Sequence, residues 1–134
     1  MERKNILIVD DELLIRDLLY DFFSEKNWIV SVSDSGRNAL EILKTRRFDL
    51  ALVDLKMPEF DGISLIKSII ARYPTLPIVI ITAFPSFESA VEALRLKVDD
   101  YITKPFNINK LFKTVCEILS KPAKQPDIIP TEKY

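Results

Sequence analysis

Histidine is absent from this sequence: none of its 134 residues is one. Without imidazole, the chain has no histidine general base, no histidine ligand for zinc and no phosphohistidine carrier. Glycine is nearly absent too, with only Gly36 and Gly62. Two glycines so far apart build neither a P-loop nor the GxGxxG turn that binds dinucleotides. Any chemistry must therefore rest on carboxylates.

Cysteine and long apolar runs are equally scarce. Cys116 is the single cysteine, so no internal disulfide can form. The apolar run after the opening Met-Glu-Arg-Lys-Asn is too short for a signal peptide. No stretch approaches the roughly 18 apolar residues that cross a bilayer. We therefore expect a cytoplasmic chain without a membrane segment.

The charge balance is close to neutral, with 19 basic and 20 acidic residues and a formal charge of -1. This balance does not predict a broad cationic surface that would bind nucleic acid or anionic lipid. We therefore expect protein partners and no direct contact with nucleic acid or membrane. The hydrophobic content of 48% is enough for one ordinary domain to bury a core without disulfides or a structural metal.

Four short apolar runs each end at a residue that can handle phosphate or metal. In order, residues 6–9 lead into Asp10 and Asp11, residues 50–53 into Asp54, residues 78–81 into Thr82, and residues 101–103 into Lys104. Continuously apolar runs are typical of parallel strands buried on both faces. Because parallel strands end at one edge of a sheet, we expect these side chains to form one site.

Apolar residues between these runs recur at helical spacing, and residues 28–32 have the β-branched content of a further strand. We expect helices to begin after Asp11, Ser35, Gly62, Ser86 and Asn107, and residues 56–62 to form a loop. The pattern predicts an α/β fold, a (βα)5 flavodoxin-like doubly wound parallel sheet with strand order 2-1-3-4-5.

The predicted domain covers residues 1–120. From residue 121 the composition changes, and Pro122, Pro126 and Pro130 forbid a continuous helix. Residues 121–134 are therefore expected to form a Pro-rich tail or linker.

The paired carboxylates predict a cation. At ~4 Å and an effective dielectric of ~20, Asp10 and Asp11 repel by about 4 kcal/mol, so a positive charge should share their site. Mg²⁺ fits, because it takes one or two carboxylates and completes its shell with water and phosphate oxygens. Asp11 has a second interpretation, as the cap of the helix that follows it.

Asp54 is the candidate nucleophile, because a carboxylate can take a phosphoryl group as an aspartyl phosphate. It needs no general base, since it is already ionised. The ammonium of Lys104 can reach a phosphoryl oxygen, and Thr82 offers a hydroxyl from the neighbouring strand end. Phosphoryl transfer mainly requires that the protein position the reacting groups and neutralise charge on the phosphoryl oxygens. A metal ion and a lysine can supply both.

Over about residues 4–120, the sequence resembles the receiver domain of two-component response regulators. The matching motifs are Ile-Leu-Ile-Val-Asp10-Asp11-Glu12, Asp54-Leu-Lys-Met-Pro58-Glu-Phe-Asp61-Gly62, Thr82-Ala83 and Tyr101-Ile-Thr-Lys104-Pro105-Phe106.

The resemblance implies that Asp54 accepts phosphate from a phosphohistidine on a sensor histidine kinase or phosphotransfer protein. It implies that Asp10, Asp11, Asp54 and the backbone carbonyl of Lys56 hold Mg²⁺. The chain would then be a phosphoacceptor signalling domain and not an enzyme that turns over a separate substrate.

The resemblance also implies a switch. Lys104 and Thr82 would bind the phosphoryl group, and Tyr101 would turn inward as Thr82 moves, which changes a surface read by a downstream output protein or domain. Lys97-Val98 stands where the family commonly has Gly-Ala.

Three other interpretations stay open. A degenerate receiver would serve only as a protein-binding scaffold. A haloacid dehalogenase-like phosphatase would need Asp-x-Asp, which Asp10-Asp11-Glu12 does not supply. A flavin-binding domain of similar architecture would suffer repulsion between these carboxylates and its phosphate.

Overall fold

The structure is a computed structural model that describes residues 3–57 and 60–122. In chain order its elements are β1 (Asn5–Val9), α1 (Leu13–Glu25), β2 (Ile29–Ser33), α2 (Gly36–Leu43), β3 (Leu50–Val53), β4 (Lys56–Met57), β5 (Phe60–Asp61), α3 (Gly62–Arg72), β6 (Ile78–Thr82), α4 (Phe87–Leu96), β7 (Asp100–Thr103) and α5 (Ile108–Ser120).

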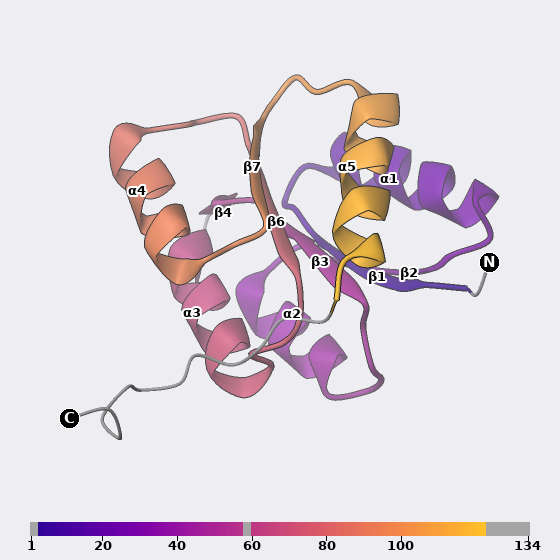
Figure 1. The fold of residues 1–134 in the computed structure, drawn as a ribbon, viewed down its shortest axis with the longest axis horizontal. Helices are drawn as coiled ribbons and strands as arrows, with labels where there is room; N and C mark the ends of the chain where they lie inside the picture. The colour runs from indigo at the N-terminus through magenta and orange to yellow at the C-terminus, as the bar shows by residue number, and fades with distance from the viewer. Residues whose placement is uncertain (1–2, 58–59, 123–134) are drawn as a thin grey trace.

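A five-stranded parallel sheet has the order β2-β1-β3-β6-β7 (Figure 1). The five strands predicted from the sequence are the strands of this sheet, so the predicted order 2-1-3-4-5 is confirmed. Each crossover between parallel strands is made by a helix, as such connections require.

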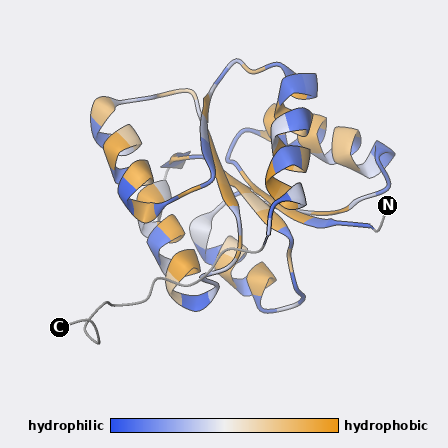
Figure 2. Cartoon of the chain, viewed as in Figure 1, coloured by the Kyte–Doolittle hydropathy of each residue, from blue (hydrophilic) through white to orange (hydrophobic). Residues whose placement is uncertain are grey.

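Helices cover both faces of the sheet. Alternate strand residues point to opposite faces: Leu7 and Val9 pack with the core beneath α2, α3 and α4, and Ile6 and Ile8 with the core beneath α1 and α5. Figure 2 shows the apolar strands lying between helices that carry both apolar and polar residues. Double burial explains why the strand sequences are apolar throughout and do not alternate.

Side-chain caps begin three helices where the sequence predicts them. Ser35 accepts a hydrogen bond from the N–H of Asn38, Ser86 from that of Ser89, and Asn107 from those of Asn109 and Lys110. Each cap satisfies a backbone donor that has no partner inside its helix.

The predicted Asp11 cap is wrong. The N-cap of α1 is Glu12, whose side chain makes no capping hydrogen bond. Instead, Asp10 Oδ1 accepts the N–H of Glu12 at 2.8 Å. The carboxylate of Asp10, just after β1, therefore satisfies a backbone N–H at the start of α1, and Asp11 is exposed.

The predicted loop 56–62 contains a feature that the sequence did not reveal. Lys56–Met57 and Phe60–Asp61 pair as two short antiparallel strands, with Lys56 opposite Asp61. Strands of two residues are too short to show a period of two.

The turn after α4 keeps a geometry suited to glycine, although Lys97 occupies it. Lys97 has φ of 59° in the left-handed region, and the Val98 N–H bonds to the Ala93 carbonyl at 3.2 Å. For a residue with a Cβ this conformation costs roughly 1 to 2 kcal/mol.

The predicted domain end lies beside the end of α5 at Ser120. The predicted tail falls almost wholly outside the described residues, so the division of the chain at residue 120 stays a prediction. No helix within residues 3–57 and 60–122 is long and apolar enough to span a membrane.

Gly62 fits against the backbone that carries Asp54. Its N–H donates to the Leu55 carbonyl at 3.0 Å. A Cβ at Gly62 would stand 2.5 Å from Leu55 Cα and 2.6 Å from the Asp54 carbonyl oxygen. Both neighbours are backbone atoms and have no rotamer through which to yield.

We therefore expect Gly62→Ala to lower the free energy of unfolding by roughly 1 to 3 kcal/mol, the usual cost of overpacking. Urea unfolding followed by circular dichroism measures it. Ser68→Ala, a change to a better helix former in α3, serves as the control and should stay within roughly 0.5 kcal/mol of wild type. Equal midpoints for Gly62→Ala and wild type would contradict the steric argument.

Candidate functional site

Asp10 and Asp54 meet at the carboxyl edge of the sheet because β1 and β3 are neighbours in register, with Val9 opposite Val53. The Asp54 N–H donates to the Val9 carbonyl at 2.9 Å, which ties the two strand ends together. Both carboxylate residues are buried, at 3% and 4% exposure. Burial makes their charge costly unless a partner offsets it.

The positive charge that offsets these carboxylates comes from Lys104, which directly follows β7. Its backbone N–H donates to the Thr82 carbonyl at 2.8 Å. Its side chain is 7% exposed, and Nζ lies 2.8 Å from Asp10 Oδ2 and 3.3 Å from Asp54 Oδ2. The expected proximity of Lys104 to the two acidic strand ends is thus present in the structure.

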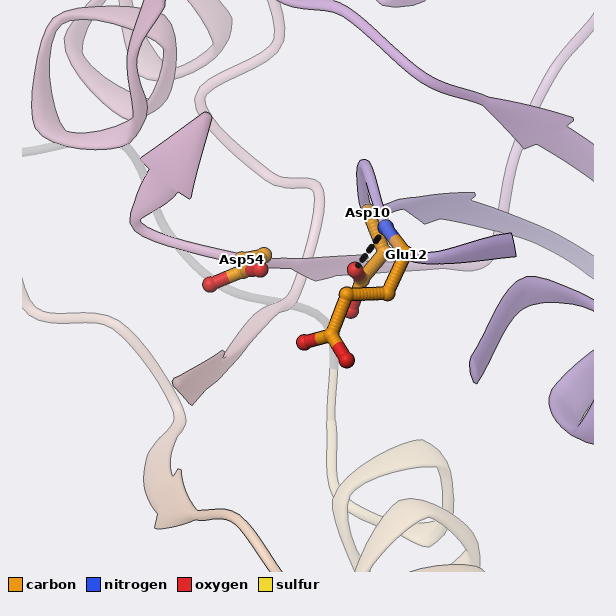
Figure 3. Close-up of side chains that lie close together, drawn as sticks. All are labelled: Asp10, Glu12 and Asp54. Atoms are coloured by element: carbon orange, nitrogen blue, oxygen red, sulfur yellow. Dashed lines mark hydrogen bonds between the residues drawn. The ribbon is translucent and has the colours of Figure 1, made fainter. Parts of the chain in front are cut away.

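Glu12 is the member of the site that sequence reasoning missed. Its Oε1 lies 2.7 Å from Lys104 Nζ. One oxygen from each of Asp10, Glu12 and Asp54 lies within 4.8 Å of the others, and Figure 3 shows the three side chains together. The sequence feature that could have indicated Glu12 is its place as the third acidic residue of the run Asp10-Asp11-Glu12.

Asp11 is exposed and is not part of this group, so its metal-binding role stays a prediction.

The site carries excess negative charge. Asp10, Glu12 and Asp54 bring three negative charges and Lys104 one positive charge, a formal sum of -2. Oxygen donors of this kind are ligands for hard divalent cations. The acidic group could therefore hold a metal ion, and a divalent ion would match the charge that Lys104 leaves unbalanced.

Burial dominates the ionisation of Asp54. Burial and the neighbouring carboxylate of Asp10 raise the Asp54 pKa, Lys104 and the Lys56 N–H lower it, and the net pKa is about 6. For Lys104, burial alone would lower the pKa, but the bonds to Asp10 and Glu12 outweigh it, and the pKa is raised. Lys104 therefore stays charged, and Asp54 titrates near pH 6 in the metal-free site.

Lys56 approaches the site through its backbone and its side chain. Its N–H donates to Asp54 Oδ1 at 3.2 Å. Its ammonium lies 5.8 Å from the ring centroid of Phe84, which is 64% exposed. Lys56 therefore contacts Asp54 through its backbone and Phe84 through its side chain.

Thr82 and Tyr101 occupy neighbouring strands β6 and β7. Thr82 is fully buried, and its Oγ1 accepts the Phe84 N–H at 3.1 Å. The half-buried Tyr101 places its hydroxyl 2.6 Å from Ser89 Oγ, and the Ser86 N–H donates to that hydroxyl at 3.4 Å. Tyr101 is thus bonded to the first turn of α4.

A doubly wound parallel sheet with an acidic pocket and a lysine at its carboxyl edge defines a class of domain suited to metal-assisted phosphoryl acceptance. The response regulator receiver domain family matches residues 6–116. The chain belongs to this family and is a receiver domain of two-component signal transduction.

Similar sequences include transcriptional regulators. The chain is 40% identical over 116 residues to the transcriptional regulatory protein ZraR of Escherichia coli O157:H7, covering 87% of this chain and 26% of the relative. It is 38% identical over 106 residues to the regulatory protein AtoC of Escherichia coli strain K12, covering 79% and 23%. This chain therefore spans about a quarter of the length of these relatives.

Solved receiver structures share the fold. A CheY-like receiver domain protein from Methanospirillum hungatei superposes with a TM-score of 0.86 at 29% identity, covering 89% of this chain and 95% of that one. A Francisella response regulator receiver domain gives 0.80 at 32% identity, covering 88% and 98%.

The raised pKa of Asp54 predicts a pH-dependent effect of Asp54→Asn. The folded pKa of about 6 exceeds the ordinary value of 3.8, so the folded protein binds more protons between these values. Ionised Asp54 therefore costs stability fully above about pH 6 and not at all below about pH 3.8. In metal-free buffer at about pH 8, Asp54→Asn should raise the free energy of unfolding by roughly 1 to 3 kcal/mol.

Urea unfolding in EDTA at several pH values measures this difference, which should shrink towards zero near pH 4. Asp17→Asn removes an exposed carboxylate from α1 and is the matched control. A gain for Asp54→Asn that is the same at both ends of the pH range would show that ionisation is not its source.

Proposed function

We propose that the carboxylate of Asp54 accepts a phosphoryl group from a phosphohistidine of a sensor histidine kinase or phosphotransfer protein. One observation carries the proposal: Lys104 Nζ lies 3.3 Å from Asp54 Oδ2 and 2.8 Å from Asp10 Oδ2 in a buried pocket. A charged lysine so placed holds Asp54 in position and can bind an oxygen of an incoming phosphoryl group.

In the transfer step, an oxygen of Asp54 attacks phosphorus as the P–N bond of the donor breaks. A P–O bond forms, and the donor imidazole leaves with the electron pair of the broken bond and takes up a proton. The protein has to hold the carboxylate in line and cancel charge on the phosphoryl oxygens. Lys104 supplies one positive charge for this purpose.

Magnesium is the proposed metal, held by Asp10, Asp11, Asp54 and the backbone carbonyl of Lys56. The formal charge of -2 and the all-oxygen donors support it, and Glu12 joins the acidic group beside Lys104. When bound, Mg²⁺ supplies charge neutralisation on the phosphoryl oxygens. By offsetting the repulsion from Asp10, the ion would lower the pKa of Asp54 and favour its ionised form further.

Thr82 and Lys104 are proposed to hold the phosphoryl group, and Tyr101 to respond. Drawing the Thr82 hydroxyl toward the phosphate would take it from the Phe84 N–H and open space into which the Tyr101 ring can turn. That turn would break the bond to Ser89 and release the first turn of α4. The altered surface of α4, β7 and α5 would then be read by an output protein or domain.

The free energy available from the phosphoryl contacts is close to the free energy that the switch requires. Two charge-assisted hydrogen bonds contribute roughly 3 to 6 kcal/mol together, and reversing a 1:99 population takes about 5.5 kcal/mol. Lys104 already bonds Asp54 before phosphorylation, so only part of its contribution is new. A partial shift of the population is therefore expected.

The partners follow from exposed apolar residues and from the relatives. The sequence places three adjacent apolar residues in α1, of which at least one must face water. Leu13 and Leu14 are 60% and 81% exposed beside Glu12, and they suit contact with a helical kinase domain that delivers phosphate in the cytoplasm. The relatives are transcriptional regulators of which this chain matches about a quarter, which supports an output domain as the second partner.

The other interpretations fare less well. The complete pocket of Asp10, Glu12, Asp54 and Lys104 argues against a degenerate scaffold. A phosphatase of the haloacid dehalogenase kind lacks support, because the chain has no Asp-x-Asp after β1. We propose that the chain assists only its own phosphorylation and dephosphorylation.

Phosphorylation itself gives the direct test. Incubation with acetyl phosphate and Mg²⁺ should raise the intact mass by one phosphoryl group, about 80 Da, as expected for an aspartyl phosphate. Asp54→Asn should show no gain, because an amide is not a nucleophile here. Asp11→Asn should slow the gain if Asp11 is a metal ligand.

The same samples test the switch by NMR. Amide signals of α4 and β7 should move on phosphorylation of wild type, and Thr82→Ala should reduce the movement while still gaining mass. An unmodified wild-type mass under conditions that phosphorylate another receiver domain would refute the proposed function.

We propose that Phe84 slows the loss of phosphate by obstructing water: its ring is 64% exposed, follows the strand that ends at Thr82, and lies 5.8 Å from the ammonium of Lys56, whose N–H contacts Asp54. Phe84→Ala should speed decay of the aspartyl phosphate by a factor of about two to ten, equal to about 0.4 to 1.4 kcal/mol. Time-resolved intact mass measures the decay. Phe87→Ala, which removes an 84% exposed ring on α4, is the control and should decay like wild type.

A further inference from the structure

A cavity of about 630 Å³ lies at the end of the sheet opposite the acidic pocket. Asp49 before β3, Pro77 before β6 and Asp99 before β7 line it, together with Lys121 after α5. Strands of four or five residues at about 3.3 Å each separate it from Asp54 by roughly 15 Å. It is therefore a second site, apart from the phosphoacceptor.

The cavity is rich in cations. The basic side chains along it are Lys4, Arg46, Arg47, Arg72 and Lys121, against the two carboxylates of Asp49 and Asp99. The formal sum is +3 in a chain whose total is -1. Within residues 3–57 and 60–122, none of these five cations forms a salt bridge.

The carboxylates of Asp49 and Asp99 both accept hydrogen bonds from the backbone. Asp49 Oδ2 accepts the Asn5 N–H at 2.7 Å, and Asp99 Oδ1 accepts the Ile78 N–H at 3.0 Å. These bonds satisfy backbone donors where β1 and β6 begin. Both carboxylates therefore hold the beginnings of strands, and in the described part of the chain the arginines that line the cavity form no salt bridge with them.

The walls between the charges are apolar. Phe48 and Leu76 are buried along the cavity, and Tyr73 is held there by a hydrogen bond from its hydroxyl to the Leu43 carbonyl at 3.3 Å. A cavity of this size suits a small organic ligand, since such sites span about 300 to 1,000 Å³. The guanidinium fork matches phosphate and carboxylate oxygens.

We infer that this cavity binds a small organic molecule that carries an apolar or aromatic body and at least two negative oxyanion charges. The arginine side chains take the oxyanions, and Phe48, Tyr73 and Leu76 take the body. Phosphate and carboxylate share this chemistry, so the experiment compares them directly.

The full chain, labelled with ¹⁵N, is titrated in EDTA with naphthyl phosphate, pyrophosphate, citrate and inorganic phosphate. Saturable shifts of amides within residues 46–49 and 72–76 support the inference, and the tighter of pyrophosphate and citrate identifies the preferred oxyanion. Naphthyl phosphate should bind about tenfold tighter than inorganic phosphate, because only it fills the apolar wall. EDTA keeps divalent ions from the acidic pocket.

Two variants locate the binding. Arg46→Gln combined with Arg47→Gln should weaken naphthyl phosphate at least about tenfold, as expected when charge-assisted bonds are lost. Arg95→Gln removes an exposed arginine from α4, outside the cavity, and should bind like wild type. Shifts that sodium chloride reproduces at equal ionic strength, or equal affinity of the double variant and wild type, would overturn the inference. Neither result bears on phosphorylation of Asp54.

Discussion

The ammonium of Lys104 among three carboxylates is the interaction on which the functional edge of this receiver domain depends. Burial pushes Asp54 toward its neutral form, and the nearby charge of Asp10 pushes it further. Lys104 opposes both and is itself kept charged by Asp10 and Glu12. One cation offsets only part of the negative charge, so the pocket is both held together and left receptive to a divalent ion.

That balance requires strands that are distant in sequence. Asp10 ends β1, Asp54 ends β3 and Lys104 follows β7, and only a parallel sheet with β1 beside β3 brings them to one edge. Thr82 and Tyr101, the side chains proposed to act as a switch, lie on the next strands along, with Tyr101 bonded to the first turn of α4. A change at the carboxylate therefore needs to cross only two strands to reach a helix at the surface.

Some features of the fold and of the site could be predicted from the sequence, and others could not. The strands and the Ser35, Ser86 and Asn107 caps could be predicted, because apolar periodicity and short polar side chains act over a few residues. The strand order followed from the few topologies that right-handed crossovers allow. The β4–β5 pair and the contribution of Glu12 could not. Two-residue strands leave no periodic trace, and Glu12 joins the site through a lysine 92 positions away. Asp11 looked like a cap, but Asp10 reaches the Glu12 N–H first.

The sequence by itself determined the buried strands, the residues at their ends and the class of chemistry, because hydrophobic pattern and residue type are local properties. It also determined the family through motifs in their order. Tertiary structure alone decided which carboxylates Lys104 contacts, that burial is the largest cause of the raised pKa of Asp54, and that five basic residues from four separate segments line one cavity. Those features depend on distance and desolvation, which exist only once the chain is packed.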